Sequence, residues 1–347
     1  MVFSSILFLF IFLPLVLAFY YICPSKGKNL VLLIFSLIFY AWGEPKYIFI
    51  MLFSSVLDYT VAIVIDKYRG LVWSKIALLV SIFANLGMLF FFKYTDFFIE
   101  VGNNVFGCNI PILGLALPIG ISFYTFQTMS YSIDVYRGNA PVQKNILSLA
   151  TYVTLFPQLV AGPIVRYKDV SEQINYREHT IEKFEDGVYR FALGLCKKVL
   201  IANNVGFIWS EVKLLNFNTI SLGTAWLGII SFAIQIYFDF SGYSDMAIGL
   251  GKMFGFDFLE NFNYPYISMS ITEFWRRWHM SLGQWFRDYV YIPLGGNRVS
   301  KQRWVLNIMI VWLLTGFWHG ADFNFMIWGL YFGIILLFEK IYFYEIL

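Results

Sequence analysis

The stretches that carry no charged residue most strongly limit the folds available to this chain. Five of them have 18 residues or more, at 2–25, 101–133, 145–165, 214–238 and 304–321. A helix needs about 20 mostly apolar residues to cross the hydrocarbon core of a bilayer. Only 14% of the residues are charged, whereas a soluble domain usually carries about 25%. The chain is therefore predicted to be an all-α polytopic membrane protein, because a helix satisfies its backbone hydrogen bonds within the membrane.

The apolar runs predict about ten membrane-spanning helices. They are expected near 2–22, 29–42, 47–65, 76–92, 112–136, 145–164, 187–209, 218–239, 304–320 and 323–342. The first run has neither a basic start nor a small-residue cleavage site, so it is interpreted as a retained span rather than a signal peptide. No repeat of 20 to 50 residues and no convincing inverted repeat is visible in the sequence.

The short loops between the early spans predict the orientation of the chain through their Lys and Arg content. Loops 23–28, 66–75 and 137–144 together contain seven basic residues, whereas the intervening loops 43–46 and 93–111 contain two. Basic loops are enriched on the cytoplasmic side of membrane proteins. We therefore expect the N-terminus outside and the three basic loops in the cytoplasm.

Two polar segments interrupt the apolar pattern. Residues 165–186 are expected to form a cytoplasmic loop or a short surface helix. In residues 262–303, aromatic and apolar residues recur at near-helical spacing from Phe274 to Tyr289, and the segment also holds six Lys and Arg residues. A helix with an aromatic face and a basic face lies along a membrane surface rather than across it. This second segment is therefore predicted to be an interfacial helix on the cytoplasmic side.

His319 lies between two apolar runs in LLTGFWHGADFNFMIWGL (313–330), although the whole chain contains only three histidines. One interpretation is a structural histidine whose ring bonds a backbone carbonyl. An ionisable group inside a membrane span is costly, however, and marks a candidate functional site. An imidazole can take a proton from a hydroxyl or thiol and return it. His319 is therefore the leading candidate for a catalytic base, and Gly316 and Gly320 leave room beside it for a substrate or another backbone.

A second histidine, His279, lies in WRRWHMSL on the predicted interfacial helix. Together with the embedded His319 it suits a site that is reached from the cytoplasm. Arg276 and Arg277 are candidates for drawing an anionic donor towards it, because guanidinium groups bind phosphates well. Anchoring of lipid headgroups is the alternative role of these basic residues. Three residues next to the histidines in the sequence are candidates for lining the substrate path: Trp278, Trp318 and Gly320.

The stretch QIYFDFSGYSDMAIGLGKMFG (235–255) is predicted to form a glycine-rich break after a span. Broken helices at membrane depth occur only where they line a cavity or are buried in protein. We therefore expect the break to border a polar pocket. Its candidate substrate residues are Asp239, Ser241, Tyr243 and Asp245. The alternative for the embedded acids is a structural ion pair that holds the helices together.

Four stretches resemble the membrane-bound O-acyltransferase family. They are FPQLVAGPIVRYKDV (156–170), IYFDFSGYSDMAIGLGKMFGF (236–256), NFNYPYISMSITEFWRRWHMSLGQWFRDYVYIPLGGNR (261–298) and LLTGFWHGADFNFMIWGLYFG (313–333). The opening MVFSSILFLFIFLPLVLAFYY and the stretch FYAWGEPKY are similar to the bacterial alginate O-acetyltransferase branch of that family. The resemblance runs from residue 1 to about 333.

The resemblance implies a single transmembrane domain over residues 1–347, with N-terminal spans in 1–144 and an acyltransferase core in 145–342. Interfacial and re-entrant helices would surround a central tunnel. His319 would be the embedded catalytic histidine, and His279 the second histidine, on the cytoplasmic side of the tunnel.

The resemblance also implies the reaction and its setting. An acyl group would come from a cytoplasmic thioester, either acetyl-CoA or an acyl-carrier-protein thioester. It would cross the bacterial cytoplasmic membrane, and an extracytoplasmic acetyltransferase partner would place it on a polysaccharide such as alginate or peptidoglycan. Members of this branch continue beyond the point where this chain stops, so either a natural short form or a C-terminally truncated sequence is expected.

Two alternative functions stay open on the sequence. A D-alanyl transferase of teichoic acid modification has the same fold and histidine and uses a carrier-protein thioester. A secondary transporter that exports an acylated compound would also use broken helices and embedded acids, although the missing inverted repeat disfavours it. No bound cofactor, metal ion or nucleic acid is expected, and Cys23, Cys108 and Cys196 do not have metal-binding or redox spacing.

Overall fold

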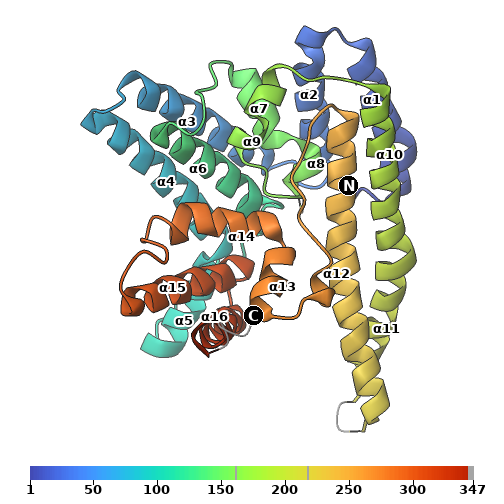
Figure 1. The fold of residues 1–347 in the computed structure, drawn as a ribbon, viewed down its shortest axis with the longest axis vertical. Helices are drawn as coiled ribbons and strands as arrows, with labels where there is room; N and C mark the ends of the chain where they lie inside the picture. Colours follow the sequence, from blue (N-terminus) through green and yellow to red (C-terminus); the bar gives the residue numbers. More distant parts are fainter. Residues whose placement is uncertain (161, 217–218, 343–347) are drawn as a thin grey trace. The chain divides into compact units, whose positions relative to one another are not determined.

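The long apolar stretches form helices in the computed structural model, which describes residues 1–160, 162–216 and 219–342 (Figure 1). All regular structure in these residues is helical, as predicted. Five helices are long and apolar enough to cross a membrane, and each overlaps a predicted span: α3 (Ile48–Lys67), α4 (Val72–Lys93), the continuous helix Ile181–Leu214, α12 (Leu222–Met253) and α16 (Phe323–Tyr342). These helices are those expected of a multi-pass membrane protein.

The predicted number of about ten spans is not confirmed. The other predicted spans coincide with shorter or more polar helices, among them the apolar helix Phe8–Ile22. An α-helix rises about 1.5 Å per residue, so α2 (Lys28–Ala41), with 14 residues, is about 21 Å long. The hydrocarbon core of a bilayer is roughly 30 Å thick. Apolar composition therefore predicted the positions of these helices but not their lengths.

The described chain forms two compact units, each built from two separate segments. The first unit consists of residues 1–49 and 145–260, and the second of residues 50–144 and 261–347, of which 343–347 lie outside the described residues. Besides α2, α12 and the start of α3, the first unit contains η1 (Phe8–Phe12), α1 (Leu13–Ile22), η2 (Ser25–Gly27), α7 (Ile146–Thr154), α8 (Phe156–Leu159), α9 (Tyr167–Asn175), α10 (Ile181–Cys196), η3 (Lys197–Ala202) and α11 (Asn203–Leu214). Besides most of α3, α4 and α16, the second unit contains α5 (Thr95–Phe106), α6 (Ile121–Arg137), η4 (Pro265–Ile267), α13 (Ile271–Arg277), α14 (Met280–Phe286), η5 (Arg287–Tyr291) and α15 (Lys301–His319). The single domain over 1–347, with subdivisions 1–144 and 145–342, stays a prediction.

The predicted surface segment 165–186 contains the short helix α9. Its Val170 and Ile174 are buried, while Glu172 is exposed. Such a division of faces is typical of a helix that packs one side on the protein. The helical alternative for this segment is therefore confirmed.

Glycines bring α10 into close contact with the C-terminal half of α12, and both helices belong to the first unit (Figure 1). A Cβ atom on Gly194 would lie 2.5 Å from the carbonyl oxygen of Gly242. One on Gly249 would lie 2.6 Å from the carbonyl oxygen of Gly187. No side chain fits at these distances, so the four glycines allow the two backbones to approach, as small residues do between membrane helices.

The predicted break in residues 235–255 is therefore wrong. α12 continues as one helix from Leu222 to Met253, through the whole glycine-rich stretch. A glycine in sequence is compatible both with a break and with close helix packing. Here Gly242 and Gly249 serve the packing against α10, and the backbone of α12 stays helical.

Ion pairs reinforce the same helix pair. Asp245 of α12 lies 2.7 Å from Arg190 and 2.6 Å from Lys197, and its side chain is only 8% exposed. Asp239, six residues earlier on the same helix, pairs with Lys198 at 2.7 Å. Both acids therefore form ion pairs of the kind that the structural alternative describes, in which charges among apolar helices pair with one another.

In the second unit, α3, α4 and α6 surround the buried carboxylate of Asp58. Ser132 of α6 donates a hydrogen bond to it at 2.6 Å, and Asn85 of α4 donates one at 2.7 Å. Ser81, also on α4, donates a third. Neutral donors, rather than a cation, therefore satisfy this acid, and the three helices are joined through it.

Candidate active site

The interfacial helix predicted in residues 262–303 is broken at His279. α13 ends two residues before it, and α14 begins directly after it. His279 has φ 45° and ψ 53°, a left-handed conformation that costs about 1–2 kcal/mol for a non-glycine residue. A backbone hydrogen bond from the Met280 N–H to the Asn261 carbonyl (2.9 Å) supports the turn. The break carries His279 into the interior, where it is 4% exposed.

His319 is the last residue of α15, and Gly320 follows it in an extended conformation. Aromatic rings contact the imidazole edge-on: the ring centroids of Trp318 and Trp328 lie 5.1 and 5.0 Å away. The second histidine, His279, also approaches this group: its ring centroid lies 5.9 Å from that of Trp318, the residue before His319. The residues around His319 are therefore aromatic and mostly apolar.

Gly316 and Gly320, which flank His319, provide room for α16. A Cβ atom on Gly316 would overlap the backbone carbonyl of Phe325, and one on Gly320 would overlap the Phe325 ring. Of the two uses that the sequence allowed for these glycines, the structure therefore shows the approach of another chain segment.

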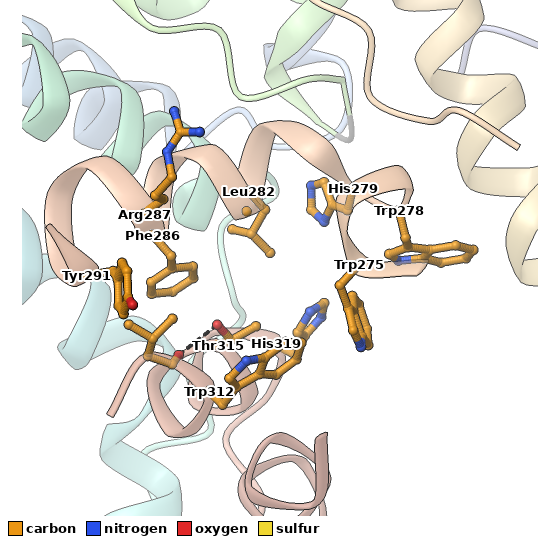
Figure 2. Close-up of a pocket in the computed structure, with 12 residues that line it drawn as sticks. Trp275, Trp278, His279, Leu282, Phe286, Arg287, Tyr291, Trp312, Thr315 and His319 are labelled. Carbon is orange, nitrogen blue, oxygen red and sulfur yellow. Dashed lines mark hydrogen bonds between the residues drawn. The ribbon is translucent and has the colours of Figure 1, made fainter. Parts of the chain in front are cut away.

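His279 and His319 line the same cavity of the second unit, which has a volume of about 200 Å³ (Figure 2). α13, the break, α14 and η5 form one side of it, and α15 forms the other. Figure 2 shows the two imidazole rings facing a common opening, with Trp275 beside them. The aromatic residues in its wall are Trp275, Trp278, Phe286, Tyr291 and Trp312.

The cavity is nearly uncharged. Among the residues that line it, all of them within the described chain, Arg287 is the only Lys, Arg, Asp or Glu, and it bonds the neighbouring Asp288 at 2.8 Å. Burial, with a smaller contribution from His319, lowers the pKa of His279 to about 3. The imidazole of His279 is therefore neutral near pH 7, and a neutral imidazole can both accept and donate a hydrogen bond.

Of the other residues predicted to surround the histidines, only some line the histidine cavity. Trp278 lines the histidine cavity, whereas the buried Trp318 lines a second, mostly apolar cavity of about 440 Å³. Arg277 forms an ion pair with Glu273 at 2.7 Å, and Arg276 is exposed. Neither arginine lines the histidine cavity, so their role at the donor stays a prediction.

The four candidates of the predicted break lie on α12 in the first unit, whereas both histidines lie in the second. Asp239 and Asp245 are held in the ion pairs described above. Ser241 is buried, and the Tyr243 ring stacks on that of Phe3 with 4.6 Å between centroids. Their role along a substrate path stays a prediction.

Sequence reasoning missed several residues of the cavity wall. Trp312 and Thr315 precede His319 by seven and four residues, so helical spacing places all three on one face of α15. That signal was available in the sequence. No comparable signal identifies Trp275, because its approach to the cavity depends on the left-handed turn at His279.

The chain is similar to known proteins over most of its length. The model of the MBOAT, membrane-bound O-acyltransferase family matches residues 37–344. The "Probable alginate O-acetylase AlgI" of Pseudomonas aeruginosa is 46% identical over 98% of this chain and 66% of its own length. The peptidoglycan O-acetyltransferase of Helicobacter pylori is 37% identical over 99% of this chain and 71% of its own length. The teichoic acid D-alanyltransferase of Bacillus subtilis is 32% identical over 64% of this chain and 60% of its own length.

The chain spans about two thirds of the length of the curated relatives it matches. The match to the first two covers nearly all of this chain, and therefore both segments of the second unit. The cavity and its two histidines thus lie within the region that is similar to named O-acetyltransferases.

Proposed function

Because the chain belongs to the membrane-bound O-acyltransferase family, we propose that it moves an acetyl group from a cytoplasmic thioester across the membrane for O-acetylation of an extracytoplasmic polysaccharide. One observation carries the proposal: His279 and His319 line the same small, nearly uncharged cavity. The names of two relatives suggest alginate or peptidoglycan as the class of polymer.

His319 is the general base in this proposal. Its imidazole takes the proton of the acceptor hydroxyl or thiol as the acceptor attacks the thioester carbonyl. The tetrahedral intermediate then collapses, the carbon–sulfur bond breaks, and the departing thiolate takes the proton from the imidazolium. His319 is restored, and the products are the acylated acceptor and the free thiol of the donor.

His279 orients the donor or stabilises the oxyanion of that intermediate. Its pKa of about 3 keeps the ring neutral, so one ring nitrogen carries a proton that it can donate. A hydrogen-bond donor that is held in place before the reaction, in a site that excludes water, stabilises developing negative charge most strongly. The left-handed backbone at His279 fits this role, because strained conformations in folded proteins gather at functional sites.

The cavity favours a neutral acyl group over D-alanine. A D-alanyl group carries an ammonium charge, and none of the residues lining the cavity is a carboxylate; the one charged side chain is that of Arg287. Burying a charge without a partner is costly. An acetyl group brings no charge, and its small size suits a volume of about 200 Å³.

The acyl donor, the membrane setting and the partner protein are part of the same proposal. Acetyl-CoA is the donor, and Arg276 and Arg277 guide its phosphates on the cytoplasmic side. About ten membrane helices surround a central tunnel in the bacterial cytoplasmic membrane, with the N-terminus outside. An extracytoplasmic acetyltransferase partner receives the acetyl group and transfers it to the polymer. Trp278, Trp318, Gly320 and the α12 residues Asp239, Ser241, Tyr243 and Asp245 are the candidates for lining the path.

The proposal is tested with radiolabelled acetyl-CoA and the full chain in lipid nanodiscs. The variants are His319→Ala and, as a matched control, His179→Ala, because His179 is the one histidine outside the cavity. We expect acceptor-dependent release of CoA by the wild type and by His179→Ala. We expect His319→Ala to lose it by about 10²- to 10⁴-fold, the usual contribution of a general base.

Other outcomes would redirect or refute the proposal. Equal turnover by wild type and His319→Ala would make His319 structural. Activity only with a D-alanyl carrier protein would favour the teichoic acid alternative. Export of an acylated compound that stops when the proton gradient is collapsed, without thioester cleavage, would favour the transporter alternative.

A further inference from the structure

The end of α4 holds the last turn of α15, which carries His319. Backbone carbonyls in the last turn of a helix have no partner within the helix. Consecutive residues at the end of α4 bind two of them: the Tyr94 hydroxyl donates to the Phe317 carbonyl at 2.8 Å, and Lys93 Nζ donates to the Trp318 carbonyl. The Tyr94 ring also stacks on the Phe317 ring, with 4.0 Å between centroids. The backbone directly before His319 is therefore attached to a second helix.

Lys93 makes these contacts with neutral groups. Besides the Trp318 carbonyl, its Nζ donates to the Ser122 hydroxyl at 3.2 Å and lies 5.5 Å from the centre of the Trp318 ring. Within residues 1–160, 162–216 and 219–342 it forms no ion pair with a carboxylate. A lysine in apolar surroundings normally pairs with an acid. The C-terminal end of a helix is the other favourable place for a cation, because the carbonyl dipoles there are directed towards it.

We propose that Lys93 is a positioning residue for the reaction at His319. Its amino group fixes the Trp318 carbonyl, and with it the backbone from which the imidazole projects into the cavity. The inference rests on the proposed function, because it concerns the placement of His319 for that reaction. It assigns Lys93 no contact with the substrate. A misplacement of about 1 Å at a catalytic group can cost about 10²-fold in rate. The loss of this contact should therefore appear in kcat rather than in KM.

The test compares acetyl transfer by the full chain in nanodiscs for four variants. Lys93→Met keeps the length of the side chain and removes the donor, and Lys93→Arg keeps a donating cation. Ser122→Ala removes the other acceptor of Lys93 without touching α15. Lys75→Met is the matched control, because Lys75 is an exposed lysine on the same helix.

We expect Lys93→Met to lower kcat by about 10²-fold with KM for acetyl-CoA within about twofold of the wild type. Lys93→Arg should recover most of this loss, and Ser122→Ala and Lys75→Met should stay close to wild type. Unchanged kcat in Lys93→Met would overturn the proposal. A loss in Ser122→Ala as large as that in Lys93→Met would also overturn it, because Lys93 would then act through α6 rather than through α15.

Hydrogen–deuterium exchange gives a readout that does not depend on turnover. Peptides covering residues 313–322 should exchange faster in Lys93→Met than in the wild type, and peptides of α10 and α12 should not change. If the wild type shows no His319-dependent transfer, the proposed function fails, while the exchange result still decides whether Lys93 fixes the turn. If Lys93→Met does not fold, Lys93→Gln replaces it, since the shorter, uncharged side chain also removes the ammonium group from the Trp318 carbonyl; unchanged exchange there would overturn the proposal.

Discussion

The two units place ionisable side chains among apolar helices in opposite ways. In the first unit, Asp245 is held between Arg190 and Lys197 on the α10–α12 interface. In the second, His279 and His319 share a cavity whose other wall residues are mostly aromatic or aliphatic and include no carboxylate. A paired charge is held in one ionisation state, whereas a neutral imidazole can still accept a proton. The comparison teaches that burial alone does not identify a candidate reactive group, and that the charges around the group must also be considered.

Removing the central acid of the ion-paired interface should have the largest effect on stability. Asp245→Ala leaves Arg190 and Lys197 on α10 and η3 without their shared carboxylate. Breaking a buried pair costs about 3–5 kcal/mol, and we expect about 3 kcal/mol here because both basic side chains are about one third exposed. Equilibrium unfolding in mixed micelles measures the change. A loss below about 1 kcal/mol would place this site with ordinary surface pairs and remove the contrast between the units.

Acidification should destabilise the protein through His279. The pKa of this residue is about 3 in the folded state and about 6.5 in the unfolded chain. The unfolded state therefore takes up the proton first as the pH falls. Stability should decrease below pH 6.5 by up to about 1.4 kcal/mol per pH unit from this group, until the pH reaches the folded value.

The variant His279→Gln checks this assignment. It has no titrating ring, so the free energy of unfolding between pH 6.5 and pH 5 should fall less steeply than in the wild type. Parallel curves for the two proteins would show that His279 does not ionise differently on unfolding, and that its surroundings are not as apolar as the cavity indicates.

Enlarging the cavity should relax its selection for a short acyl group. Trp312→Ala removes a large ring from the wall opposite α13 and α14, and each extra methylene accommodated in an apolar pocket is worth about 1–3 kcal/mol. We expect the preference for acetyl-CoA over butyryl-CoA to fall by about tenfold. Trp312→Phe should give a smaller change in the same direction. Trp226→Ala, at an exposed tryptophan of α12, is the control, and an equal change there would rule out a role for cavity size.

The outer ion pair should contribute least. The Asp239 side chain is 41% exposed, against 8% for Asp245. Exposed pairs are worth about 0–1 kcal/mol, so Asp239→Asn should lower the free energy of unfolding by no more than that. A loss as large as that of Asp245→Ala would mean that Asp239 has a further role on α12.

The sequence predicted helices well where a local pattern determines them. The predicted spans 47–65, 76–92 and 323–342 lie within a few residues of α3, α4 and α16. The prediction failed at Gly242 because a glycine allows both a break and a close contact. Only the position of Gly194 on another helix decides between the two.

The candidate site shows the same division between local and distant information. His319 was recognisable because an ionisable residue stands out between apolar runs. The left-handed turn at His279 had no signal in the sequence, since the helical spacing of aromatic residues continues across it. The contact of Lys93 with the Trp318 carbonyl joins residues 225 positions apart, and no local pattern encodes it.

A double-mutant cycle on the two histidines tests the central claim most directly. Acetyl transfer is measured for the wild type, His279→Ala, His319→Ala and the double variant, each with its folding checked by thermal unfolding. If the two rings act together on one substrate in one cavity, the double variant should be no more than about threefold slower than His319→Ala alone, because losses within a catalytic unit are not additive. Losses that multiply would mean that the histidines act independently, and full activity in His319→Ala would contradict the account of the site.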